Sequence, residues 1–86
     1  MRLEPRPEGG FTIDATDLGP LLGIDPPLVP GLLRDGRIQS RFERGEGEDE
    51  GRFRLTFLYR GVRLRLILDG EGTVLSRSRV MAASAR

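Results

Sequence analysis

Residues 52–69 constrain the fold more than any other stretch, because they have the pattern of two half-buried strands joined by a short turn. Apolar residues recur at every second position on both sides of Arg60-Gly61. They are Phe53, Leu55, Phe57, Tyr59, Val62, Leu64, Leu66 and Leu68. A period of two places each set on one face of a strand, and a two-residue turn places both sets on the same face. A one-residue slip would divide them, so the stretch predicts a β-hairpin with a single register.

The turn of this hairpin is less well specified than its register. Gly61 suits a primed two-residue turn, which needs positive φ angles. Arg60 suits it less, since asparagine or aspartate is more usual at that position. The sequence therefore predicts the hairpin and leaves the turn type open.

The residue inventory excludes several kinds of functional site. The chain has 86 residues, enough for one small domain, and contains no cysteine, histidine or lysine. Disulfides, the common zinc sites, Ser-His-Asp triads and Schiff-base chemistry are therefore excluded. The remaining carboxylates, serines and single tyrosine form no recognisable constellation. We therefore predict a protein that is not an enzyme and that needs no cofactor or metal.

Every basic residue is an arginine, and the arginines are unevenly distributed. Residues 1–36 hold three arginines against six acidic residues, whereas residues 37–86 hold eleven against seven. A GC-rich genome would produce such a bias, since lysine and asparagine have AT-rich codons. Whatever the origin of the bias, each cationic side chain of the protein is a planar guanidinium, which suits phosphate, carboxylate and aromatic partners.

The first ten residues contain two prolines and end in Gly9-Gly10, which predicts a flexible tail over residues 1–10. This segment lacks the apolar core of a signal peptide. No apolar run approaches the length needed to cross a membrane, so we expect a cytoplasmic protein. Residues 11–13 fit a short strand or an extended lead-in to a helix.

The first of two short helices is predicted over residues 14–23. Either Asp14 or Asp17 can serve as its N-cap, and Gly23 ends it. Pro20 is tolerated best in the first turn of a helix, which favours Asp17 as the cap or a late start of the helix.

The second helix is predicted between Asp25-Pro26, an N-cap followed by proline, and Gly36. Pro30 removes an internal hydrogen bond and is expected to distort it. The buried stripe of this helix is expected to contain Leu32, Leu33 and either Leu28 or Val29.

Two further strands are expected, one before the hairpin and one after it. Residues 37–44 form the first strand, with Ile38, Ser40 and Phe42 directed inward. If Phe42 pairs with Leu55, Glu43 lies opposite Arg54 as a cross-strand ion pair. Residues 73–80 form the last strand after a turn at residues 69–72.

The register of the last strand is open to two interpretations. One places Leu75 inside and opposite Leu66, with Val74 outside; a one-residue shift reverses the two. We prefer the first because it pairs two apolar residues. Residues 81–86 are expected to fray.

The predicted fold class is α+β, with two short N-terminal helices packed on one face of a four-stranded antiparallel β-meander. A single domain would cover residues 11–80. The other face of the sheet would be open to solvent.

This open face is the candidate binding surface. Its members would alternate with the core residues of the strands: Arg41, Arg54, Leu58, Arg63, Arg65 and Ile67. Leu58 and Ile67 could form a small apolar patch ringed by arginines, a composition typical of protein interfaces, so we predict contacts with an unidentified protein partner or a second copy of the chain. The competing interpretation is a solvated strand face that only reflects arginine bias.

Nucleic-acid binding by the same arginines is the alternative function. Phosphates would be natural partners of such a face. Sheet surfaces that bind nucleic acids normally add exposed aromatic residues for base stacking, whereas Phe53, Phe57 and Tyr59 are expected to point inward. The lack of exposed aromatic residues favours protein contacts over nucleic-acid binding. We also expect no membrane association.

Residues 45–51 combine glycines with Glu46, Glu48, Asp49 and Glu50. The spacing lacks the ligand pattern of an EF-hand calcium loop. We predict an exposed loop that could lie across the arginine face and partly neutralise it.

Residues 17–38 run through a helix, a glycine turn and a second helix into Asp35-Gly36-Arg37-Ile38. The arrangement resembles the helix-turn-helix of excisionase and MerR-type winged DNA-binding domains. The second helix, however, presents prolines, leucines, valine and glycine where a recognition helix needs residues that bind bases. The resemblance therefore implies topology more than DNA binding.

Over nearly its whole length the chain also resembles an uncharacterised family of small bacterial proteins that is common in GC-rich proteobacteria. The residues that carry this likeness are Leu21-Leu22-Gly23, Val29-Pro30, Arg37-Ile38, residues 41–49 and 51–57, Asp69-Gly70 and Val74-Leu75. The resemblance implies a bacterial source and a domain of unknown function, without catalytic residues to transfer.

Overall fold

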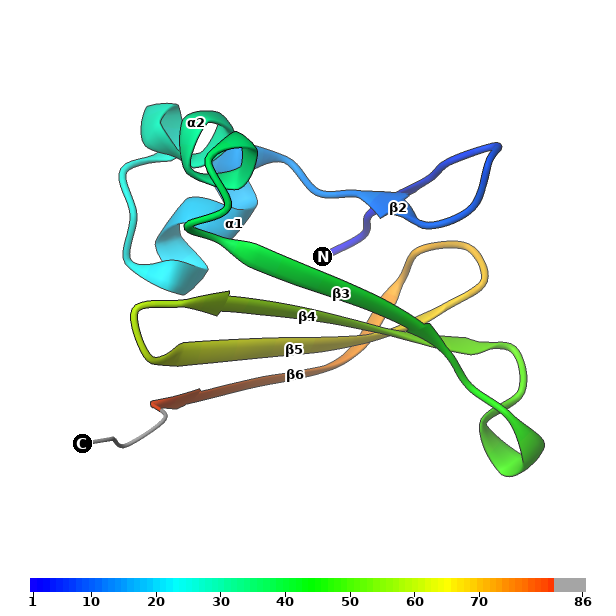
Figure 1. Cartoon of the computed structure of the whole chain (residues 1–86). Coiled ribbons are helices and arrows are strands. Elements are labelled where there is room, and N and C mark those ends of the chain that lie inside the picture. The colour runs from blue at the N-terminus through cyan, green and yellow to red at the C-terminus, as the bar shows by residue number, and fades with distance from the viewer. Residues whose placement is uncertain (82–86) are drawn as a thin grey trace.

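The computed structural model describes residues 1–81 and confirms an α+β fold in two layers (Figure 1). One layer is an antiparallel sheet of four strands, β3 (Gln39–Arg44), β4 (Arg52–Tyr59), β5 (Val62–Asp69) and β6 (Val74–Met81), in that order. The N-terminal segments cover one face of this sheet, and within residues 1–81 no further layer covers the other face. The predicted meander is therefore correct.

The β4–β5 hairpin has the predicted register. Leu55 lies opposite Leu66, Phe57 opposite Leu64 and Tyr59 opposite Val62. Both turn residues have positive φ angles, 48° at Arg60 and 79° at Gly61, as a type I′ turn requires. Arg60 is the one non-glycine residue with positive φ in the described chain, and its guanidinium lies 5.5 Å from the centre of the Tyr59 ring.

Strand β3 also pairs with β4 as expected. Phe42 lies opposite Leu55, and Glu43 lies opposite Arg54. Ile38, just before the strand, is buried, whereas Ser40 and Phe42 are exposed because β3 is an edge strand. The β3–β4 loop contains a short 3₁₀ turn at Gly47–Asp49.

The preferred register of the last strand was wrong. The turn closes between Asp69 and Thr73, whose backbone groups are joined by a hydrogen bond of 3.1 Å, so Val74 pairs with Leu68 and packs on the core. A β-bulge then inserts one extra residue, and Leu75 is 49% exposed on the other face. Two features account for the error: the turn is one residue shorter than expected, which places Val74 on the core face, and the bulge leaves Leu75 on the outer face together with Ser76.

The first helix, α1, covers Ala15–Leu22 and is capped by Asp14, whose side chain accepts from the Thr16 backbone N–H at 3.2 Å. The expectation that Asp17 forms the cap was wrong. Pro20 lies inside the helix and removes one internal hydrogen bond. Gly23 ends the helix with a φ of 75°, as predicted.

The second helical segment is a 3₁₀ turn, η1 (Pro26–Leu28), followed by α2 (Val29–Arg34). Pro30 lies in the first turn of α2, where it disturbs the helix little. Val29 is buried and Leu32 packs against the core, but Leu33 is 37% exposed, so its expected place in the buried stripe was wrong. The expected distortion by Pro30 is therefore small, because the residue lies where its missing N–H has no partner inside the helix.

The first ten residues differ from the expected flexible tail. Strand β1 (Glu4–Pro5) pairs with β2 (Phe11–Thr12) in a small antiparallel hairpin. Leu3 donates its backbone N–H to the Gly72 carbonyl at 2.7 Å, and its side chain is only 2% exposed. The prolines and glycines of this segment form the hairpin instead of freeing the chain. At the other end, Met81 of β6 pairs with Val62 of β5. The remaining residues of the expected C-terminal tail, 82–86, lie outside the described residues.

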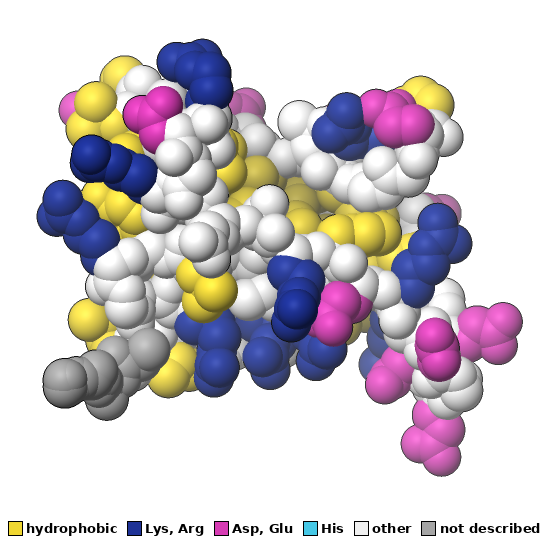
Figure 2. All heavy atoms as spheres, viewed as in Figure 1, with side chains coloured by type: hydrophobic (Ala, Val, Ile, Leu, Met, Phe, Trp, Pro, Cys, Tyr) yellow, Lys and Arg dark blue, Asp and Glu magenta, His cyan; other side chains and the backbone are white. Residues whose placement is uncertain are grey.

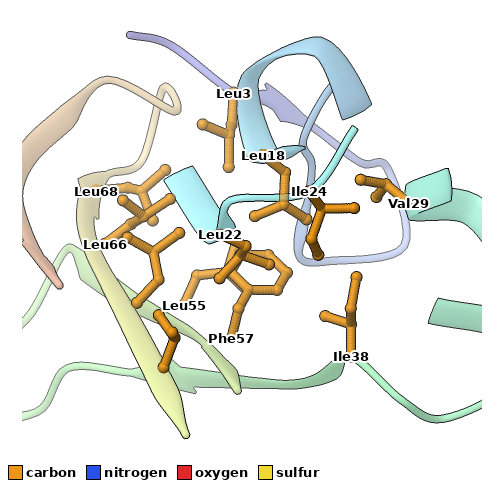
Figure 3. Packing of buried hydrophobic residues seen from close by; sticks show 12 residues of the cluster. Leu3, Leu18, Leu22, Ile24, Val29, Ile38, Leu55, Phe57, Leu66 and Leu68 are labelled. Atoms are coloured by element: carbon orange, nitrogen blue, oxygen red, sulfur yellow. The ribbon is translucent and has the colours of Figure 1, made fainter. Parts of the chain in front are cut away.

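The core lies between the sheet and these N-terminal segments (Figure 3). Leu18 and Leu22 of α1 are directed toward Leu55 and Phe57 of the sheet, and Leu3 is directed toward Leu68. The apolar set named by the hairpin pattern supplies much of this core: Leu55, Phe57, Val62, Leu64, Leu66 and Leu68 are all buried. Within residues 1–81, no helix is long and apolar enough to cross a membrane.

Replacing Leu3 with alanine tests whether the N-terminal segment belongs to the folded domain. Because the side chain is buried, Leu3→Ala should lower the free energy of unfolding by about 2–5 kcal/mol in denaturant titration. The matched control is Leu28→Ala, which removes the same atoms from a side chain that is 58% exposed and should change stability by less than about 0.5 kcal/mol. Equal, small effects of both substitutions would show that residues 1–10 form a flexible tail after all.

Candidate functional site

The uncovered face of the sheet presents three rows of side chains that follow from the strand register. The middle row runs Arg41, Thr56, Arg65 and Ser78 across the four strands. One flanking row is Gln39, Leu58, Arg63 and Val80, and the other is Glu43, Arg54, Ile67 and Ser76. All six residues predicted for the binding surface therefore lie on this face.

Five of these six residues line one groove of about 450 Å³, which we call the basic groove. Its full lining is Gln39, Ser40, Arg41, Glu43, Arg54, Thr56, Leu58, Arg63 and Arg65. Thr56 is only 8% exposed, although within residues 1–81 no other segment of the chain packs on this face. Its burial therefore comes from neighbouring side chains of the sheet. Since threonine is short and its neighbours in the row are Arg41 and Arg65, Thr56 forms the floor and the arginines form the walls.

The arginines of the groove are not neutralised by an equal number of acids. Glu43 is the single carboxylate in the lining. Arg54 donates from Nε to Glu43 Oε1 at 2.8 Å, as the register predicted. Within residues 1–81, Arg41, Arg63 and Arg65 form no ion pair. The groove is thus a positively charged concavity with three guanidinium groups available to a partner.

The ion pair also changes the ionisation of its members. The hydrogen bond from Arg54 lowers the pKa of Glu43 below its ordinary range, and Coulombic attraction from Arg54, Arg41 and Arg65 acts in the same direction. The hydrogen bond to Glu43 raises the pKa of Arg54 above its ordinary value, helped by Coulombic attraction from Glu43 and then from Asp49. Glu43 therefore stays ionised in mildly acidic solution and holds Arg54 against the sheet.

Arg65 has an unusual polar atom. Its Nε is buried and has no hydrogen-bond partner among the described residues. Arg65 lies between Thr56 on β4 and Ser78 on β6 in the middle row of the uncovered face. Because Nε is buried, an acceptor oxygen of a partner would reach this donor only after the side chains over it rearrange.

Ile67, the sixth predicted residue, lies in a second and larger concavity of about 750 Å³ next to the first. Arg54 lines both, and the second also contains Leu75, Arg52, Glu46 and Asp49. The sequence did not predict Leu75 on this face, because its placement depends on the bulge in β6. The acidic loop therefore borders one end of the arginine face, and it leaves the basic groove open.

Figure 2 shows this distribution of charge. Dark blue side chains gather along the lower edge of the molecule, on the side of the sheet away from the helices, and the acidic loop projects beside them. In the described part of the chain, no group of three or more potential ligands could hold a metal ion.

The helical segments do not form a second basic surface. Leu28, Pro30 and Leu33 are exposed on η1 and α2, and Arg34 is the one basic residue of these segments. Apart from Arg34, the residues of α2 are apolar or glycine and offer no side chain that would read bases.

A scan against protein-family models places the whole chain, residues 1–86, within one family. The chain belongs to a family of unknown function (DUF6522). Comparisons with curated proteins and with solved structures gave no match. The membership agrees with the likeness to an uncharacterised family that the sequence suggested, and it assigns no activity. The function of this DUF6522 protein must therefore be argued from its own surface.

The Glu43–Arg54 pair predicts a pH-dependent contribution to stability. Because the folded state lowers the pKa of Glu43, the pair stabilises the fold at pH above the ordinary glutamate range, and this is lost as the pH falls through the lowered pKa. Thermal unfolding of wild type and Glu43→Gln, measured from about pH 7 to about pH 3, should show curves that differ at neutral pH and converge in acid. Arg54→Gln should remove the same contribution. Wild-type and Glu43→Gln midpoints that run in parallel over the whole range would contradict the assignment.

Proposed function

We propose that this protein is a non-enzymatic, cytoplasmic binding protein that uses the basic groove to hold an acidic segment of another protein. The observation that carries the proposal is the groove itself, in which Arg41, Arg63 and Arg65 have no carboxylate partner among residues 1–81 and surround the floor formed by Thr56. Guanidinium groups bind carboxylates with paired, charge-assisted hydrogen bonds. A segment with several aspartate or glutamate residues would satisfy them together.

Apolar side chains at both ends of the arginine cluster support a protein partner. Leu58 is 42% exposed beside Arg63, and Leu75 is exposed beside Ile67 at the other end. A partner with leucine or valine residues next to its acids would bury these side chains and release water from them. Apolar positions bordered by arginines are a common composition of protein interfaces.

Nucleic-acid binding is the second candidate, and the same arginines favour it. No aromatic residue lines the groove within residues 1–81: Phe42 and Phe53 instead contact each other and Phe11 of the N-terminal hairpin. Base stacking would therefore be missing, and only phosphate contacts would remain. Such binding would weaken steeply with salt and show little sequence preference.

Fluorescence anisotropy with an acidic, leucine-containing peptide tests the proposal. The double variant Arg63→Gln/Arg65→Gln should weaken binding about tenfold or more, since two charge-assisted contacts are lost. The matched control is Arg77→Gln/Arg79→Gln, which makes the same change in net charge on β6 residues that face the other side of the sheet. The control should bind as wild type does.

Duplex and single-stranded DNA, titrated at two salt concentrations, separate the two candidates. We expect the peptide to bind more tightly than either DNA at about 0.15 M salt, because binding that depends on phosphate contacts weakens steeply as salt is added. Tighter binding of DNA that depends on Arg63 and Arg65 would establish the alternative. Equal losses in the groove and control variants would show that the groove has no specific role.

A further inference from the structure

The free edge of β3 carries a pattern that is complementary to itself. β3 is the first strand of the sheet, so one side of its backbone has no partner among the described residues. From Gln39 to Arg44 its side chains are exposed except for Glu43, which is half-buried. Edge strands are often protected against pairing by proline, bulges or charged side chains. β3 has no proline, and its charged residues, Arg41, Glu43 and Arg44, include both signs, so two copies of the strand can place opposite charges against each other.

The hydrogen-bond pattern shows which backbone groups of β3 are free. Gly45 donates to the Arg52 carbonyl at 2.8 Å, so this opposed pair is a hydrogen-bonded one. Hydrogen-bonded and non-hydrogen-bonded pairs alternate along an antiparallel ladder. The backbone N–H and C=O of Ser40, Phe42 and Arg44 therefore point away from β4 and toward the open edge.

A second copy can use these groups in a symmetric antiparallel pairing centred on Phe42. Phe42 would exchange hydrogen bonds with its counterpart, and Ser40 with Arg44 of the other copy. The same register places Arg41 opposite Glu43 twice, once in each direction. Centring the pair on Arg41 or on Glu43 instead would oppose like charges, which destabilises cross-strand pairs. The charge order along β3 thus selects one register.

The side chains on both faces fit this arrangement. Glu43 receives Arg54 on Oε1, which leaves Oε2 for Arg41 of the second copy. On the inner face, Phe42 is 36% exposed and stacks on Phe53 with ring centres 5.6 Å apart. Figure 2 shows hydrophobic side chains in the hollow between the helices and the N-terminal hairpin, along the edge formed by β3. Phe42 of a second copy would cover part of this surface.

The other free edge does not offer the same match. β6 carries Arg77 and Arg79 on one face, opposite Leu66 and Leu64 of β5. Symmetric registers centred on residues 77, 78 or 79 oppose arginine with arginine, as a protected edge would.

We propose that two copies of the chain associate through β3, in the register centred on Phe42, to form a continuous eight-stranded sheet. Such an interface is isologous, because each copy contributes the same strand. It would join the two basic grooves, since Gln39, Ser40 and Arg41 line the groove at this edge. In the dimer Arg41 pairs with Glu43 of the second copy, so Arg63 and Arg65 are the guanidinium groups left for a ligand of the groove.

Charge exchange between two variants tests this dimer. In the register centred on Phe42, position 41 of each copy faces position 43 of the other. Arg41→Glu would therefore place two carboxylates opposite each other, and Glu43→Arg would place two guanidinium groups opposite each other. Sedimentation equilibrium should therefore show each variant self-associating about tenfold or more weakly than wild type. An equimolar mixture should associate again, because the mixed pair lets a carboxylate of one variant face a guanidinium of the other. Arg77→Glu on β6 is the matched control and should dimerise as wild type does. Circular dichroism would verify that each variant is folded.

A second variant tests the backbone contacts without changing any charge. Ser40→Pro removes only an N–H that points to the open edge, so the β3–β4 pairing should persist while dimerisation is lost. Wild type that remains monomeric up to about millimolar concentration would overturn the proposal. So would dimerisation that is unaffected by Ser40→Pro and Arg41→Glu, or that is abolished by Arg77→Glu or by Leu58→Glu on the outer face.

Discussion

The antiparallel pairing of β4 with β5 is the constraint on which the rest of the structure depends. It opposes Leu55 to Leu66 and thereby collects the apolar side chains of both strands on one face. The same pairing necessarily collects Arg54, Arg63 and Arg65 on the other face. Because side chains alternate along a strand, burial of the apolar set leaves the arginines on the exposed face. Strands β3 and β6 extend both faces of the sheet.

The two faces have different physical roles. Carbon atoms on the core face lose contact with water when α1 and Leu3 pack on them, which is the main source of stability in so small a domain. The guanidinium groups on the outer face gain little from folding, apart from Arg54, which is held by Glu43. A surface that stabilises the fold weakly and whose Arg41, Arg63 and Arg65 form no ion pair within residues 1–81 is suited to binding.

Sequence reasoning predicted the sheet well, because the period-two pattern and the Arg60-Gly61 turn both act over short distances. It failed where long-range contacts decide. The burial of Leu3 depends on pairing with the turn around Gly72, almost the whole chain away, and a proline- and glycine-rich segment gives no local sign of it. The exposure of Leu75 depends on a bulge that alternation cannot reveal. The six residues of the candidate surface were predicted because strand alternation alone places them.

Replacing two adjacent residues of β5 tests this separation of faces most directly. Leu66→Ala should lower the free energy of unfolding by about 2–5 kcal/mol, because Leu66 is fully buried. Arg65→Ala should lower it by less than about 1 kcal/mol and should weaken binding of the acidic peptide instead. Comparable losses of stability from both substitutions, with peptide binding unchanged by Arg65→Ala, would contradict the account.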